Sequence, residues 1–111
     1  MYCEDLDYSI RLKQNGIKIK LVPSAKLWHK VGATSGNSES PICAYYGSRN
    51  RLYLINQHPE EFSVIAKPYV IVTRLARALL GKLKGQSTWK LYIKAVKDFQ
   101  KGIRGRTVIS Y

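Results

Sequence analysis

The sequence contains little cysteine and no long hydrophobic run. Its two cysteines, Cys3 and Cys43, are too few for a disulfide framework and too few for a cysteine-based zinc site. No run of about 18 apolar residues occurs, so a simple membrane-spanning helix is not expected. What remains is an ordinary globular composition, with 45% hydrophobic and 23% charged residues, which excludes a disordered or collagen-like chain.

Acidic residues are also scarce, since 7 Asp+Glu stand against 19 Lys+Arg in 111 residues and the formal net charge is +12. Such a balance indicates an anionic partner, which can be a nucleic acid, a phospholipid surface or a phosphorylated substrate. Residues 1–58 carry 8 basic and 4 acidic side chains, whereas residues 59–111 carry 11 and 3. Two thirds of the excess therefore belong to the half that follows His58-Pro59, a dipeptide that favours a break in the chain.

The first half has an α/β pattern. Residues 4–14 predict a helix that begins with acids and ends at Asn15-Gly16. Residues 17–22 alternate apolar and polar side chains and predict a strand, and residues 25–30 predict a second short strand. After a small-residue loop, Ser40-Pro41 predicts the start of a helix over 41–57.

The second half has a helical pattern. Apolar residues recur at helical spacing over residues 60–83, where Pro68 must kink or restart the helix. A last helix is predicted over about 87–101, with lysines largely on one face. Helices of this kind can lie in an anionic membrane interface, and an ordinary solvated basic face is the alternative. No motif that reads DNA or RNA occurs.

The acidic cluster Glu4, Asp5 and Asp7 is the first candidate site. Carboxylates at a helix entrance can bind a divalent metal, or one of them can act as a base toward a hydroxyl. The alternative is that these acids only complement the helix dipole and pair with Arg11, four residues after Asp7.

Two further candidates follow along the chain. His29 can ligate a metal, or it can be a half-buried polar residue of a strand. Arg49 offers a planar fork suited to phosphate oxygens, with Tyr45 and Tyr46 able to stack on a base or a sugar. The alternative is an amphipathic helix with its tyrosines in the core and its arginine in water.

Taken in order, these pieces resemble one known pattern. The pattern resembles the C-terminal part of the catalytic domain of family 2 glycosyltransferases, the GT-A enzymes, and especially rhamnosyltransferase-like members. Its motifs, in order, are Glu-Asp-x-Asp, Arg-Leu-x-x-x-Gly, Val-Pro, Trp-His-Lys, a small-residue loop and Tyr-Tyr-x-x-Arg-Asn-Arg. The resemblance covers residues 2–58, and residues 59–111 are only loosely similar to the helical tail that often follows in these proteins.

The resemblance implies a fold and a set of roles. The fold would be α/β: residues 1–58 as the acceptor-side C-terminal part of a GT-A (Rossmann-like) domain with two short strands, and residues 59–111 as a mainly helical basic extension. Asp5 would be the catalytic base and Glu4 would shape the acceptor site. His29 would help to hold a divalent metal, Mg²⁺ or Mn²⁺. The substrate-binding residues would be Arg49, Asn50, Asp7 and Arg11.

The resemblance also implies partners. The reaction would be an inverting transfer from a nucleotide-sugar donor to a hydroxyl of a cell-surface polysaccharide or glycolipid acceptor, in the cytoplasm and peripherally on the inner face of the cell membrane. The upstream nucleotide-binding half of these enzymes and its Asp-x-Asp metal motif are not in the sequence, so we expect a fragment with little activity alone. A non-catalytic basic module that binds anionic lipid or nucleic acid is the alternative.

Overall fold

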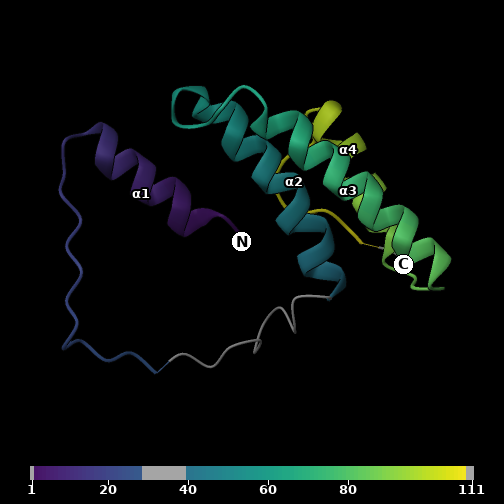
Figure 1. The fold of residues 1–111 in the computed structure, drawn as a ribbon, viewed down its shortest axis with the longest axis horizontal. Helices are drawn as coiled ribbons and strands as arrows, with labels where there is room; N and C mark the ends of the chain where they lie inside the picture. The colour runs from purple at the N-terminus through teal and green to yellow at the C-terminus, as the bar shows by residue number, and fades with distance from the viewer. Residues whose placement is uncertain (1, 29–39, 110–111) are drawn as a thin grey trace.

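The computed structural model describes residues 2–28 and 40–109, and every regular element among them is helical. In chain order these are α1 (Glu4–Gln14), α2 (Pro41–Gln57), the short 3-10 helix η1 (Pro59–Glu61), α3 (Ala66–Leu83) and α4 (Trp89–Gln100). Figure 1 shows α2, α3 and α4 side by side, with α1 off to one side.

The helix boundaries follow local signals in the sequence. At the start of α2 the Ser40 hydroxyl accepts a hydrogen bond from the Cys43 amide at 3.2 Å, and Pro41 occupies the first turn, where its missing N–H costs nothing. Gly16, two residues beyond α1, has a φ of 71°, in the left-handed region that glycine adopts without strain. Pro68 lies in the first turn of α3, so the helix restarts just before this proline and is not kinked by it.

The core lies between α2 and the two helices that pack on it. One cluster joins Ala44 and Tyr45 of α2 to Leu91 and Ala95 of α4. A second cluster joins α2 to both α3 and α4 through Leu52, Ile55, Val70 and Val96. The small alanines allow α2 and α4 to approach each other closely, and residues 59–109 therefore pack back onto α2.

The prediction of an α/β fold with two short strands, the C-terminal part of a GT-A domain, is wrong for the described residues, which form no strand. Residues 17–22 keep their alternating pattern, yet Ile17, Ile19 and Leu21 are all more than half exposed. A strand exists only through hydrogen bonds to a neighbouring strand, and no segment of the described chain supplies them. Of the second predicted strand, residues 25–28 have no regular structure, and residues 29 and 30 lie outside the described residues.

Polar contacts attach α1 to the junction of α2 and η1. The Asp7 carboxylate of α1 lies 2.8 Å from Nε2 of His58, and His58 is a buried residue. Lys13 forms a 2.6 Å ion pair with Glu61, and Gln14 hydrogen-bonds Glu60. Ile10 is the single buried residue of α1, so the position of this helix depends on hydrogen bonds more than on apolar packing.

Candidate functional site

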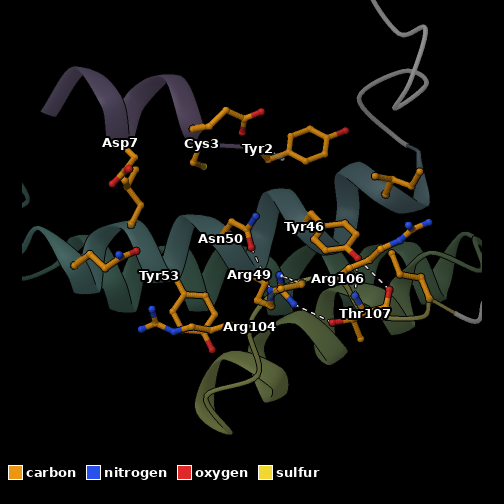
Figure 2. Close-up of a pocket in the computed structure, with 16 residues that line it drawn as sticks. Tyr2, Cys3, Asp7, Tyr46, Arg49, Asn50, Tyr53, Arg104, Arg106 and Thr107 are labelled. Atoms are coloured by element: carbon orange, nitrogen blue, oxygen red, sulfur yellow. Dashed lines mark hydrogen bonds between the residues drawn. The ribbon is translucent and has the colours of Figure 1, made fainter. Parts of the chain in front are cut away.

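A cavity of about 830 Å³ lies between the start of α1, one face of α2 and the C-terminal segment. Figure 2 shows the beginning of α1 on one side of it, with Asn50 and Tyr53 of α2 on the other and Arg104 and Arg106 nearby. Carboxylates, amides, aromatic rings and guanidinium groups thus line one cavity. Its polar and aromatic lining residues include Glu4, Asp7, Tyr46, Asn50, Tyr53, Gln57, Arg104 and Arg106.

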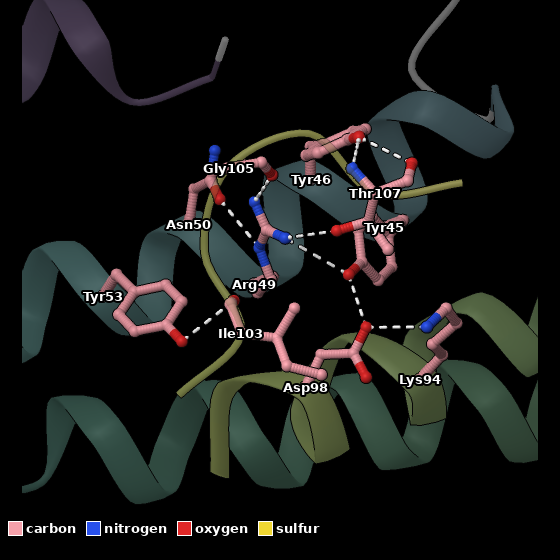
Figure 3. A network of polar contacts seen from close by, with 10 residues as sticks. All are labelled: Tyr45, Tyr46, Arg49, Asn50, Tyr53, Lys94, Asp98, Ile103, Gly105 and Thr107. Atoms are coloured by element: carbon pink, nitrogen blue, oxygen red, sulfur yellow. Dashed lines mark hydrogen bonds and ion pairs between the residues drawn. The ribbon is translucent and has the colours of Figure 1, made fainter. Parts of the chain in front are cut away.

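Arg49 holds the C-terminal segment against α2. Its guanidinium is 3% exposed and donates to the Gly105 carbonyl at 2.8 Å and to the Thr107 hydroxyl at 3.1 Å. It also lies 5.1 Å from the ring centroid of Tyr45 and 5.1 Å from that of Tyr46, in cation–π range. Because these donors are engaged within the protein, Arg49 acts here as a positioning residue for the cavity wall (Figure 3).

Two tyrosine hydroxyls complete this attachment. The Tyr46 hydroxyl donates to the Thr107 carbonyl at 3.0 Å and accepts from the Thr107 amide at 2.9 Å. The Tyr53 hydroxyl donates to the Ile103 carbonyl at 3.0 Å, and the guanidinium of Arg104 lies 4.7 Å from the Tyr53 ring centroid. The Tyr-Tyr-x-x-Arg-Asn-Arg motif therefore binds residues 102–107 of the predicted basic extension.

A buried carboxylate continues the network into α4. Asp98 accepts hydrogen bonds from the Tyr45 hydroxyl and, at 2.7 Å, from the Lys94 ammonium. Burial alone would raise the pKa of Asp98, but the hydrogen bonds from Lys94 and Tyr45 outweigh it and hold this pKa below its usual value. The hydrogen bond to Asp98 in turn raises the pKa of Lys94. The Tyr45–Asp98–Lys94 chain thus fixes the side of α2 that carries Arg49.

The predicted acidic residues are divided between two environments. Glu4 and Asp7 line the cavity, whereas Asp5 is exposed on the first turn of α1 and does not line it. The predicted pair of Asp7 and Arg11 is present at 2.9 Å, but Asp7 also contacts His58, so its carboxylate holds α1 in place. Arg11 is directed to Asp7 in this pair and does not line the cavity.

The predicted phosphate-binding pair has different partners from those expected. Asn50 lines the cavity next to Arg49, and its side-chain oxygen accepts from Arg49 Nε at 3.2 Å. The arginines that reach the same cavity from the C-terminal segment, Arg104 and Arg106, were missed, although the alternation of glycine and arginine over residues 102–106 was a usable signal.

The predicted metal ligand His29 lies outside the described residues. Over residues 2–28 and 40–109, no group of three or more His, Cys, Asp or Glu side chains could hold a metal ion. The divalent metal, Mg²⁺ or Mn²⁺, therefore stays a prediction. None of the helices described is long and apolar enough to cross a membrane.

Asp98→Asn tests the buried network. A carboxylate with a lowered pKa stabilises the fold above its unfolded pKa, and this contribution is lost as the pH falls through the lower, folded pKa. We expect Asp98→Asn to reduce the free energy of unfolding by about 1–3 kcal/mol near neutral pH, because it removes a charge-assisted hydrogen bond. The measurement is urea unfolding as a function of pH.

The difference between wild type and Asp98→Asn should shrink as the solution is acidified below about pH 4. The matched control is Glu60→Gln, since the Glu60 side chain is 56% exposed and the variant should stay close to wild type. A difference that is constant across the acidic range would show that the Asp98 charge is not what stabilises this network.

A scan of protein-family models, a search of curated proteins and a search of solved structures each gave no match to this chain. The resemblance of residues 2–58 to family 2 glycosyltransferases therefore stays a prediction. The strongest physical observation about function is the cavity itself, in which the acidic start of α1 faces tyrosines, amides and arginines.

Proposed function

We propose that this chain forms the acceptor-binding side of an inverting sugar transfer. The observation that carries the proposal is the shared cavity of Glu4, Tyr53, Asn50 and Gln57. Sugars expose apolar C–H faces and polar hydroxyls together, so a ring beside carboxylate and amide groups suits them, as in small-ligand sites with a few placed polar groups. The cavity volume of about 830 Å³ is in the range of such sites.

The transfer needs a base at the acceptor. In an inverting step the acceptor oxygen bonds to the anomeric carbon while the bond from that carbon to the leaving nucleoside diphosphate breaks, and a carboxylate takes the acceptor proton. Asp5 is the candidate that the resemblance gives for this role, and it directly follows Glu4, which lines the cavity. Arg104 and Arg106 add positive charge on the same cavity, where the leaving diphosphate becomes more negative.

The surface of α3 supports a location at an anionic membrane. Its outward side is a stripe of exposed apolar residues at helical spacing, Ile65, Tyr69, Val72, Leu79 and Leu83, each 60% exposed or more. Lys82 and Lys84 flank the end of this stripe, and residues 59–111 carry 11 basic against 3 acidic side chains. An apolar stripe with a basic border matches an anionic bilayer surface. We therefore propose attachment to the inner face of the cell membrane, where a glycolipid acceptor would be available.

Tyr53→Ala tests sugar binding in the cavity. We expect the variant to bind methyl glycosides up to about tenfold more weakly, because an aromatic contact contributes roughly 0.5–1.5 kcal/mol. The measurement is saturation-transfer NMR of the full chain with methyl glycosides of glucose, galactose, mannose, rhamnose and N-acetylglucosamine. Tyr8→Ala is the control, since Tyr8 is exposed on α1 and does not line the cavity. Equal weakening by both variants, or no binding to wild type, would contradict an acceptor site here.

Asp5→Asn tests the base. Transfer of radiolabelled sugar from nucleotide sugars to endogenous acceptors is compared in extracts of cells that carry the wild-type or the variant gene. We expect the rate to fall at least about a hundredfold, because a general base contributes roughly 10²–10⁴ in rate. Glu61→Gln serves as the carboxylate control, since Glu61 only pairs with Lys13 beyond the cavity. A wild-type rate in Asp5→Asn would remove Asp5 from the reaction.

Leu79→Asp tests the membrane proposal. We expect its partition onto vesicles of phosphatidylglycerol and phosphatidylcholine to fall at least about tenfold, since burying a leucine is worth roughly 1.5–3 kcal/mol. The control is Val108→Asp, which places the same charge at an exposed apolar residue of the C-terminal segment, outside the stripe. Co-sedimentation measures both. Loss of binding in both variants, or in neither, would argue against the α3 stripe as the lipid-binding surface.

A further inference from the structure

The inner side of α3 contains a buried arginine with one unpartnered nitrogen. Arg74 is 9% exposed and lies on the same side of α3 as the buried residues Val70, Ala78 and Gly81. Its Nε is shielded from solvent and has no hydrogen-bond partner in the part of the chain that the structure describes. Buried side-chain nitrogens are almost always hydrogen-bonded, so this atom calls for an explanation.

The charges around Arg74 make its position less favourable still. Burial lowers the pKa of Arg74, and the nearby guanidinium groups of Arg51 and Arg77 lower it further. Tyr92 and Cys43 are the other groups that act on it, so none of the groups that shift this pKa is a carboxylate. Arg51 of α2 and Arg77 of α3 are thus the like charges that act on Arg74, and a bound anion would offset their repulsion.

The protein itself provides no such anion among the residues described. Asp98 is the buried carboxylate of the described chain, and it is already occupied by Tyr45 and Lys94. Arg49, the other buried arginine of α2 and α3, shows the contrast, since its guanidinium is bound to the protein by several hydrogen bonds. Arg74 thus has the burial of a structural arginine, yet its Nε donor is unused.

We propose that Arg74 binds a phosphate group between α2, α3 and α4. A guanidinium presents paired N–H donors that match two phosphate oxygens, and the exposed Arg51 and Arg77, whose charges act on Arg74, would neutralise the second charge. The half-buried Tyr92 of α4, which also acts on Arg74, carries a hydroxyl that can donate to a phosphate oxygen. The phosphate can belong to a soluble phosphate ester or to a lipid headgroup. This site is separate from the proposed sugar cavity, whose lining includes none of these four residues.

The test is a titration of the full chain with inorganic phosphate and pyrophosphate, with the ionic strength held constant by sodium chloride. We expect the melting temperature to rise with the logarithm of the ligand concentration, by about 5 °C at roughly ten times the dissociation constant. The Arg74 Nε–H signal in a ¹H–¹⁵N spectrum should shift to saturation with the same dissociation constant. In Arg74→Leu the rise in melting temperature should be lost.

Arg11→Gln is the matched control, because it removes one exposed arginine charge on α1, outside the lining of the sugar cavity, and should keep the response to phosphate. We expect Arg74→Leu to fold, since it replaces an unpaired buried charge by an apolar side chain. If it does not, the double variant Arg51→Gln/Arg77→Gln, which changes exposed residues, should weaken phosphate binding at least about tenfold. An equal rise in melting temperature for wild type, Arg74→Leu and Arg11→Gln would overturn the proposal, as would an Arg74 Nε–H signal that does not move.

A parallel arm with vesicles distinguishes the source of the phosphate. Phosphatidic acid in phosphatidylcholine is compared with phosphatidylcholine alone, for wild type and Arg74→Leu. Loss of binding in Arg74→Leu, with no response of wild type to soluble phosphate, would assign the site to a lipid headgroup. A response to soluble phosphate alone would assign it to a soluble ester. Vesicle binding that is the same in both proteins, together with no response to soluble phosphate, would exclude the site.

Discussion

The buried guanidinium of Arg49 is the interaction on which the candidate cavity depends. Removing an arginine side chain from water is favourable only when its hydrogen-bond donors find acceptors within the protein. The acceptors of Arg49 are the Tyr45 hydroxyl, the Thr107 hydroxyl and the Gly105 carbonyl. These acceptors belong to α2 and to the C-terminal segment, so one side chain joins parts of the chain that are 56 residues or more apart. Without this junction the segment that carries Arg104 and Arg106 would have little reason to lie along the cavity.

The same junction explains why α2 and α4 approach so closely. Tyr45 is fully buried, and its hydroxyl links Arg49 on one side to Asp98 on the other. The network alternates cation, hydroxyl and carboxylate, so each buried charge has an opposite or polar neighbour. The Nε of Arg74 has no hydrogen-bond partner among the described residues, although Arg74 lies in the same bundle. The difference between two buried arginines of one small fold is the physical basis for treating one as structural and the other as a ligand-binding group.

Local signals made the helices predictable, whereas long-range pairing could not be read from the sequence. Helix α1 was predicted over residues 4–14 and α2 over residues 41–57, and both occur with these bounds because caps, proline and glycine act within a few residues. The predicted strand over residues 17–22 was wrong. Alternation of apolar and polar side chains shows only that a segment could have one apolar face, whereas a strand also needs a neighbouring strand to hydrogen-bond. The role of Arg49 was equally hidden, since its acceptors lie far away in the sequence.

The cavity has acidic residues at the start of α1 on one side and the arginines of the C-terminal segment on the other. The two groups are held in place by different interactions. The arginines are positioned by a buried network with defined donors and acceptors. The acids are positioned by Asp7–His58 and by partly exposed polar pairs at the far end of α1. Exposed pairs contribute little free energy, so α1 can move relative to α2 at much lower cost than the C-terminal segment can. A ligand that contacts both sides of the cavity would therefore fix the position of α1, and with it the distance between the carboxylates and the rest of the site.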